Sequence, residues 1–101
     1  MATSKIKATG LGAPQSVDLW SNWTAPANGI VNAVVGWNNG ASYGYCYIKD
    51  TTTGDWVCMI SNANNLGGFS ESASFPVIKG HVYKVDSSNQ VGSLNTKFYS
   101  L

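Results

Sequence analysis

The segment Trp23–Trp37 reads W-T-A-P-A-N-G-I-V-N-A-V-V-G-W, and it decides how the rest of the chain is organised. It opens with residues that favour turns. Pro26 fixes its own φ and biases Ala25 toward extended backbone, and Asn28 and Gly29 can supply the positive φ of a tight turn. We therefore expect a strand to begin directly after Gly29.

The nine residues Ile30–Asn38 are apolar at nearly every position, and their side chains alternate between two faces. Ile30 and Val34 point to one face, which Asn32 and Gly36 interrupt. The other face is formed by Val31, Ala33, Val35 and Trp37. The segment is short for a helix and rich in β-branched residues, so the pattern predicts a strand near the middle of a packed sheet.

The rest of the chain alternates between short extended segments and turn residues, with a turn signal about every eight to twelve residues and no helical period. This pattern predicts one all-β domain over residues 1–101, an antiparallel β-sandwich or jelly roll of about seven or eight strands. Residues 1–12 are expected to hold a first short strand or to act as a tether, and Pro76 indicates an edge strand or a bulge. The other strands are expected at Lys5–Thr9, Ser16–Trp20, Ser42–Lys49, Asp55–Ser61, Phe69–Ile78, His81–Asp86 and Val91–Leu101.

Charged residues make up only 11% of the chain, so its polar surface must be built from Ser, Thr, Asn and Gly. That composition is typical of extracellular and virion β proteins. The chain has no Arg and a net charge of +1, which argues against nucleic-acid binding. No apolar run approaches the length of a membrane span, and M-A-T-S-K-I-K lacks the apolar core of a signal peptide. We expect a virion or extracellular protein without membrane insertion.

Two cysteines, Cys46 and Cys58, flank the turn Asp50–Gly54 of a predicted hairpin. If paired residue numbers sum to 104, the cysteines are direct cross-strand neighbours and a disulfide is feasible. A sum of 106 keeps the two cysteines on one face but one residue pair apart, and a sum of 105 puts them on opposite faces. We expect them on one face within one pair of each other, and reduced, as in a virion protein assembled in the cytosol.

Both faces of this hairpin are apolar. Cys46 and Ile48 share one face with Trp56 and Ile60 by parity, so the tyrosines lie on the other. A two-layer sandwich buries one face of each sheet, and a large aromatic patch on the other face indicates an interface. Either face could be the core by this argument. A symmetric homotrimer is expected, with an interface formed by Tyr43, Tyr45, Tyr47, Val57 and Met59.

Three segments together resemble the C-terminal tip domains of bacteriophage tail fibres and related virion appendages. They are W-T-A-P-A-N-G-I-V at Trp23–Val31, S-F-P-V-I-K-G-H-V-Y-K-V at Ser74–Val85 and K-F-Y-S-L at Lys97–Leu101. The resemblance covers most of the chain in layout and implies a compact jelly roll, similar in shape to trimers of the tumour necrosis factor and complement type. It also implies a homotrimer at the end of a fibre, facing the host surface. The turn Lys79-Gly80 is structural in such domains.

The sequence does not predict a catalytic, metal or cofactor site. His81 is the only histidine and follows a turn glycine, and no Cys, His or Asp cluster at ligand spacing surrounds it. No serine occupies a nucleophile elbow, and no Gly-rich segment precedes a helix that could hold a phosphate. The acids are scattered along the chain at Asp18, Asp50, Asp55, Glu71 and Asp86. The expectation is a protein that is not an enzyme.

Carbohydrate binding is the chemistry that the composition favours. Aromatic faces stack on the apolar faces of sugar rings, while Asn side chains bond the hydroxyls. The candidate ligand-binding residues are Trp20, Trp23, Asn38, Asn39, Asn62, Asn64 and Asn65. The expected function is a receptor-binding or adhesin tip domain that recognises a host surface glycan. The alternative is a structural trimerisation knob or capsid decoration protein.

Overall fold

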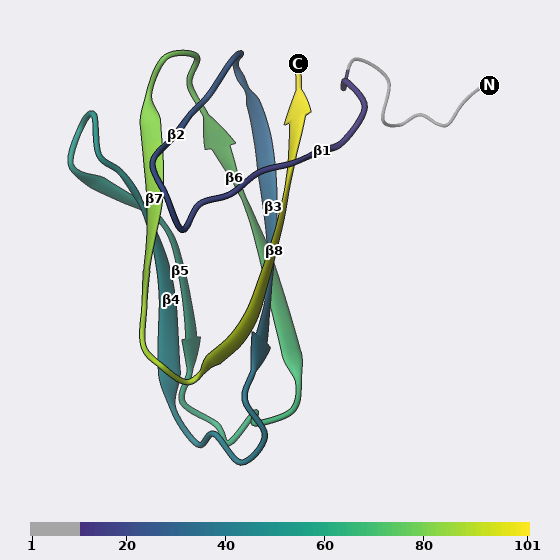
Figure 1. Cartoon of the computed structure of the whole chain (residues 1–101), viewed down its shortest axis with the longest axis vertical. Coiled ribbons are helices and arrows are strands. Elements are labelled where there is room, and N and C mark those ends of the chain that lie inside the picture. The colour runs from purple at the N-terminus through teal and green to yellow at the C-terminus, as the bar shows by residue number, and fades with distance from the viewer. Residues whose placement is uncertain (1–10) are drawn as a thin grey trace.

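The computed structural model describes residues 11–101, which form eight strands in two four-stranded antiparallel sheets (Figure 1). The first sheet has the strand order β1-β8-β3-β6, and the second has the order β2-β7-β4-β5. No helix within residues 11–101 is long and apolar enough to cross a membrane. The strands are β1 (Gln15–Ser16), β2 (Trp23–Thr24), β3 (Gly29–Trp37), β4 (Gly44–Asp50), β5 (Asp55–Asn62), β6 (Ser70–Val77), β7 (Val82–Ser87) and β8 (Val91–Ser100).

The two antiparallel sheets confirm the predicted β-sandwich, and their strand pairings are nested as in a jelly roll. Strand β4 pairs with β5, β3 with β6, β2 with β7 and β1 with β8, so the chain resembles one long hairpin rolled into two layers. The predicted strand Lys5–Thr9 lies outside the described residues. The predicted edge position of the strand that contains Pro76 is confirmed, because β6 pairs only with β3. Proline has no backbone N–H to donate to a second neighbouring strand, so an edge strand accommodates it.

The prediction for β3 is confirmed in its face and its place. It lies between β6 and β8, and Val31, Val35 and Trp37 are buried on one side. The predicted role of Gly29 is wrong, since the positive-φ residues do not include it. Gly29 is instead the first residue of β3, where a Cβ would collide with the Tyr99 carbonyl oxygen and the Phe98 ring. Close packing, not backbone conformation, requires glycine there.

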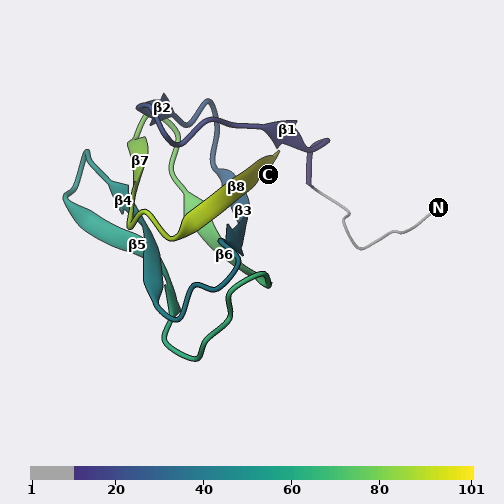
Figure 2. The ribbon, with the colours of Figure 1, turned by 60° about the horizontal axis from the view of Figure 1, so that its bottom comes forward.

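The predicted strand Ser16–Trp20 is wrong beyond its first residue. The paired strand covers only Gln15–Ser16, and Val17 N–H still donates to the Thr96 carbonyl of β8 at 3.2 Å. The chain then crosses to the other sheet, where the Leu19 carbonyl accepts a hydrogen bond from Val85 N–H at 2.8 Å. Figure 2 shows this segment passing from the β8 side to the β7 side. The alternation in the sequence reflects Leu19 entering the core while its neighbours face solvent. It does not reflect pairing within one sheet.

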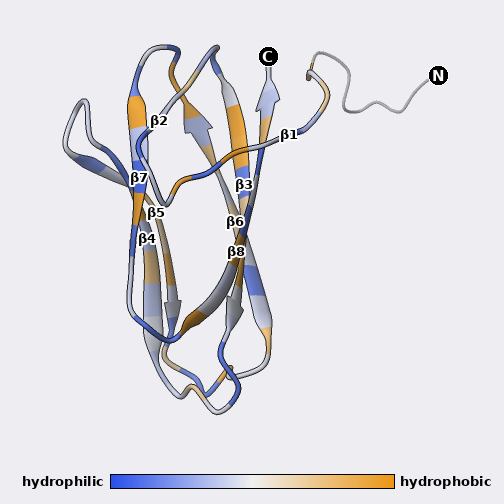
Figure 3. Cartoon of the chain, viewed as in Figure 1, coloured by the Kyte–Doolittle hydropathy of each residue, from blue (hydrophilic) through white to orange (hydrophobic). Residues whose placement is uncertain are grey.

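The core lies between the two sheets. Figure 3 shows apolar and polar bands alternating along β3 and β7, as expected when each strand contributes one face. Strands β4 and β5 contribute Cys46, Ile48, Cys58 and Ile60, and β7 contributes Tyr83 and Val85. The face of the β4–β5 hairpin that carries the cysteines is therefore the core face, and the tyrosine face points outward.

Candidate functional site

The outer surface of the second sheet carries three neighbouring aromatic side chains, the half-buried Tyr45 and Tyr47 and the exposed Trp56. We call it the aromatic face. Strand β4 lies between β7 and β5, so its outward side chains have neighbours on both sides. The aromatic face consists of Tyr45, Tyr47, Lys49, Trp56, Met59, Ser61, Lys84 and Asp86.

The strand register arranges these residues in rows across the sheet. Lys49 is opposite Lys84 on one side and opposite Trp56 on the other. In the next row Tyr47 lies between Asp86 and Met59. Because directly opposed side chains on one face have Cβ atoms about 5 Å apart, each row is a set of direct neighbours.

A β-bulge between Ile48 and Lys49 corrects the predicted faces of the hairpin. The pairing Ile48 with Cys58 changes to Lys49 with Trp56, which leaves Val57 without a partner. Trp56 therefore belongs to the aromatic face and not to the core face, and it is 45% exposed. Val57 packs partly against the core instead of standing among the tyrosines. An extra residue in one strand reverses which side chains point to which face beyond the bulge. Assigning faces from odd and even residue numbers assumes a regular register and therefore misses this reversal.

The aromatic rings form one connected row. The Tyr45 and Tyr47 ring centroids are 4.9 Å apart, and those of Tyr47 and Trp56 are 5.9 Å apart. The Lys49 ammonium lies 5.1 Å from the Trp56 ring centroid, within the range of a cation–π contact. The Tyr47 hydroxyl lies 3.3 Å from the Ser61 hydroxyl. These contacts restrict the orientations of the three rings.

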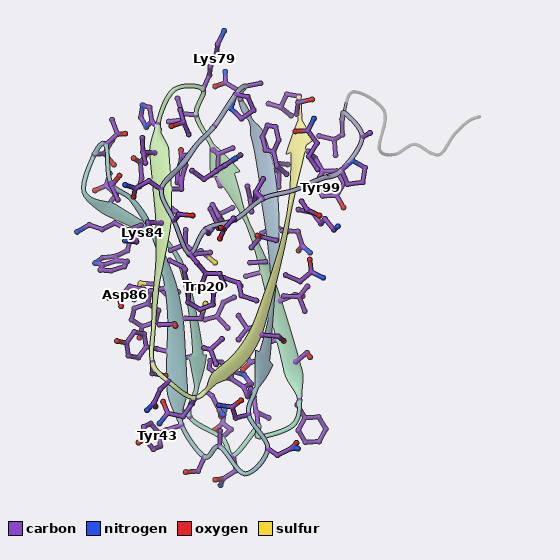
Figure 4. All side chains as sticks on the ribbon, in the orientation of Figure 1. Trp20, Tyr43, Lys79, Lys84, Asp86 and Tyr99 are labelled. Atoms are coloured by element: carbon purple, nitrogen blue, oxygen red, sulfur yellow. The ribbon has the colours of Figure 1, made fainter. Side chains whose placement is uncertain are left out.

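A hollow of about 280 Å³ lies at the β7 side of the aromatic face. Figure 4 shows Lys84 and Asp86 on the outer side of β7, and Tyr43 at the opposite end of the molecule from Lys79. Within residues 11–101 the only ion pair joins His81 and Asp50, so neither lysine of the hollow is paired with a carboxylate. The residues that line the hollow are Lys49, Thr51, Lys84, Val85 and Asp86.

The two predicted tryptophans lie along the β1–β2 segment. Trp20 is 51% exposed in the crossing between the sheets. Trp23 is half-buried, with its ring centroid 6.0 Å from that of Tyr83 and 5.3 Å from that of Phe98. Trp23 thus closes the space between the two sheets, and Trp20 has the more accessible ring.

The predicted asparagines lie at the end of the molecule where β3 and β5 finish. Asn38, Asn39, Asn64 and Asn65 are exposed there. Asn62 is buried, and its amide donates to the Ala41 carbonyl while its oxygen accepts from Leu66 N–H. Asn62 therefore shapes the 62–69 loop. The structure brings these asparagines together and keeps them apart from Trp23, which is paired with Tyr83 near the start of β7.

His81 contacts Asp50, and their nitrogen and oxygen atoms are 2.7 Å apart. Burial disfavours the ionised Asp50, but hydrogen bonds from His81 and from the Thr53 and Thr52 N–H groups outweigh it and hold the Asp50 pKa below its usual value. The other Asp50 oxygen accepts from the Thr52 and Thr53 backbone. The pair therefore ties the 51–54 turn to the start of β7.

Comparisons of this chain with protein families, curated proteins and solved structures found no match. Its candidate site therefore depends on geometry. Sequence reasoning missed Lys49, Lys84 and Asp86 as site residues and put Trp56 on the wrong face. The spacing Tyr45-x-Tyr47-x-Lys49 shows from the sequence that the lysine shares the face of the tyrosines. Its neighbour Lys84 could not be found in this way, because β4 and β7 are distant in the sequence.

Proposed function

We propose that this chain is a non-catalytic receptor-binding domain that recognises a surface carbohydrate through its aromatic face. The observation that carries the proposal is the connected row of Tyr45, Tyr47 and Trp56 on an outward sheet surface. The sequence resemblance to tail-fibre tip domains supports the same role, a domain at the end of a virion appendage that contacts a host glycan.

The chemistry of the aromatic face suits a sugar. Ring faces contact the C–H surfaces of a pyranose, and the ring hydroxyls need donors and acceptors close by. Trp56 is 45% exposed, while Ser61 and Asp86 flank the tyrosines. Tyr45 and Tyr47 are half-buried against their neighbours, so little side-chain entropy remains to be lost on binding.

A glycan array tests the proposal, with bacterial polysaccharides and host glycans printed together. Trp56→Ala should lower binding about tenfold, since stacking on one aromatic ring is worth about 1–3 kcal/mol in comparable contacts. Phe69→Ala is a matched control, because Phe69 is 65% exposed in the loop before β6 and away from the aromatic face. Trp20→Ala tests the candidate loops along the β1–β2 segment. Silence of the wild-type protein across the array would reject the proposal.

Assembly is the second candidate function, and the uncharged end of the aromatic face favours it. Met59 on β5 is 62% exposed, and Tyr43, which directly precedes β4 and adjoins this end of the face, is 63% exposed. Apolar area left in water costs about 25 cal/mol per Å², so covering these side chains in a homotrimer would be favourable. Such an interface is not expected to include the other end of the face, which carries Lys49 and Lys84. A symmetry axis there would bring the lysines of different chains close together, and their like charges would repel.

A further inference from the structure

We propose that the hollow lined by Lys49 and Lys84 is a subsite for the anionic group of an acidic saccharide, a carboxylate-bearing sugar. This inference rests on the proposed function and names the class of carbohydrate. Its observations are separate from the aromatic row: two directly opposed lysines and a concave surface between β4 and β7.

Lys49 and Lys84 are directly opposed on neighbouring strands, and among the described residues Asp86 is the one carboxylate that lines the hollow with them. Like charges directly opposite on neighbouring strands destabilise a sheet. Within residues 11–101 neither ammonium forms an ion pair with a carboxylate. An anion bound between the two ammonium groups would attract both of them. The pair is therefore understandable as a binding feature.

The hollow has room for the group that we infer. Its volume is about 280 Å³, and Thr51 and Asp86 line it together with the lysines. Lysine ammonium groups bond the anion, and the Thr51 hydroxyl and the Asp86 carboxylate can bond sugar hydroxyls. Asp86 lies opposite Tyr47, which places this acceptor next to the aromatic row. The Lys49 ammonium lies over the Trp56 ring, so the lysines of the hollow directly adjoin the aromatic row.

A sugar fits these features better than a nucleic acid does. A phosphate backbone needs a basic stripe along its length, and this chain has six cations, no Arg and a net charge of +1. Two lysines next to aromatic rings and a carboxylate match one anionic substituent on a ligand that is otherwise neutral and rich in hydroxyls.

The test is an array of uronic-acid and sialic-acid oligosaccharides, each printed beside its methyl ester. The wild-type protein should bind at least one acid more strongly than its ester, and added salt should lower only the binding of the acid. Lys84→Gln should weaken that acid about fivefold and leave the ester unchanged. Lys79→Gln is the control, because Lys79 is an exposed lysine in the turn before β7.

Lys84→Glu separates binding from stability. It replaces the opposed like charges with an ion pair to Lys49, so the unfolding temperature should rise while binding of the acid is lost. Equal binding of acid and ester, unaffected by Lys84→Gln but lost in Trp56→Ala, would overturn the anionic subsite and keep the proposed function. Binding of neither form, together with silence on the wider glycan array, would overturn both.

Discussion

At the scale of single residues, Asp50 shows how one side chain can join separate parts of the fold. One carboxylate oxygen contacts His81 at 2.7 Å, and the other accepts from Thr52 N–H at 2.9 Å. The carboxylate is nearly excluded from water, so ionisation is favoured only because these donors face it. An acid in a turn was expected from the sequence, but its bond to a histidine thirty-one positions away was not.

Asp50→Asn should lower the free energy of unfolding by about 1–3 kcal/mol at neutral pH, because hydrogen bonds to a charged group are lost. The Asp50 pKa is lowered in the folded state. Its contribution is therefore fully present above the unfolded value of about 3.9 and disappears as pH falls through the lower folded value. Urea unfolding at neutral and acidic pH measures this difference, which should shrink in acid.

Asp18→Asn is the control for that series, since exposed Asp18 also accepts a hydrogen bond from a backbone N–H. It should change stability much less at either pH. A pH-independent difference between wild type and Asp50→Asn would contradict the assigned role of the Asp50 charge.

At the scale of elements, the β4–β5 hairpin decides which side chains reach solvent. Its register sums to 106 over most of its length, so Cys46 faces Ile60 and Cys58 faces Ile48. The cysteines share the core face one pair apart and are free thiols, as expected. Beyond Ile48 the bulge brings Trp56 outward. One irregularity thus sets both the core and the aromatic face.

The thiols give a prediction about this hairpin. Burial, with a smaller contribution from Cys58, raises the Cys46 pKa to about 11, and burial also raises the pKa of Cys58. Both thiols are therefore protonated and shielded, and native protein at pH about 8 should resist iodoacetamide. Protein unfolded in urea without reductant should take up two labels by mass spectrometry. A requirement for reductant before labelling would indicate a disulfide and contradict the register.

At the scale of the whole molecule, the two sheets present different outer surfaces. The aromatic face has rings and lysines, whereas the outer side of β3 and β6 combines apolar side chains such as Ile30 and Pro76 with the polar pair Asn32 and Ser74, whose side-chain oxygens are 3.0 Å apart. A trimer would most economically cover the uncharged part of the aromatic face. The charged part would then stay open for a ligand.

We predict a homotrimer by light scattering at micromolar concentration, and Tyr45→Lys should dissociate it, because a charge on each chain would enter the interface. Tyr99→Lys is the matched control, since Tyr99 lies on β8 in the other sheet (Figure 4). It should keep the trimer. A monomeric wild type would reject the assembly proposal, and a dimer would keep the covered face but not the three-fold symmetry.

The sequence by itself determined the class of fold, most strands and the two faces of β3, because side-chain alternation is local and has a period of two. It also predicted the tyrosine surface opposite Cys46 and Ile48. Only the tertiary structure decided that Ser16–Trp20 crosses between sheets, that Trp56 turns outward and that Lys84 opposes Lys49. Those features depend on register, a bulge and pairing between distant segments, and a shift of one residue reverses every face.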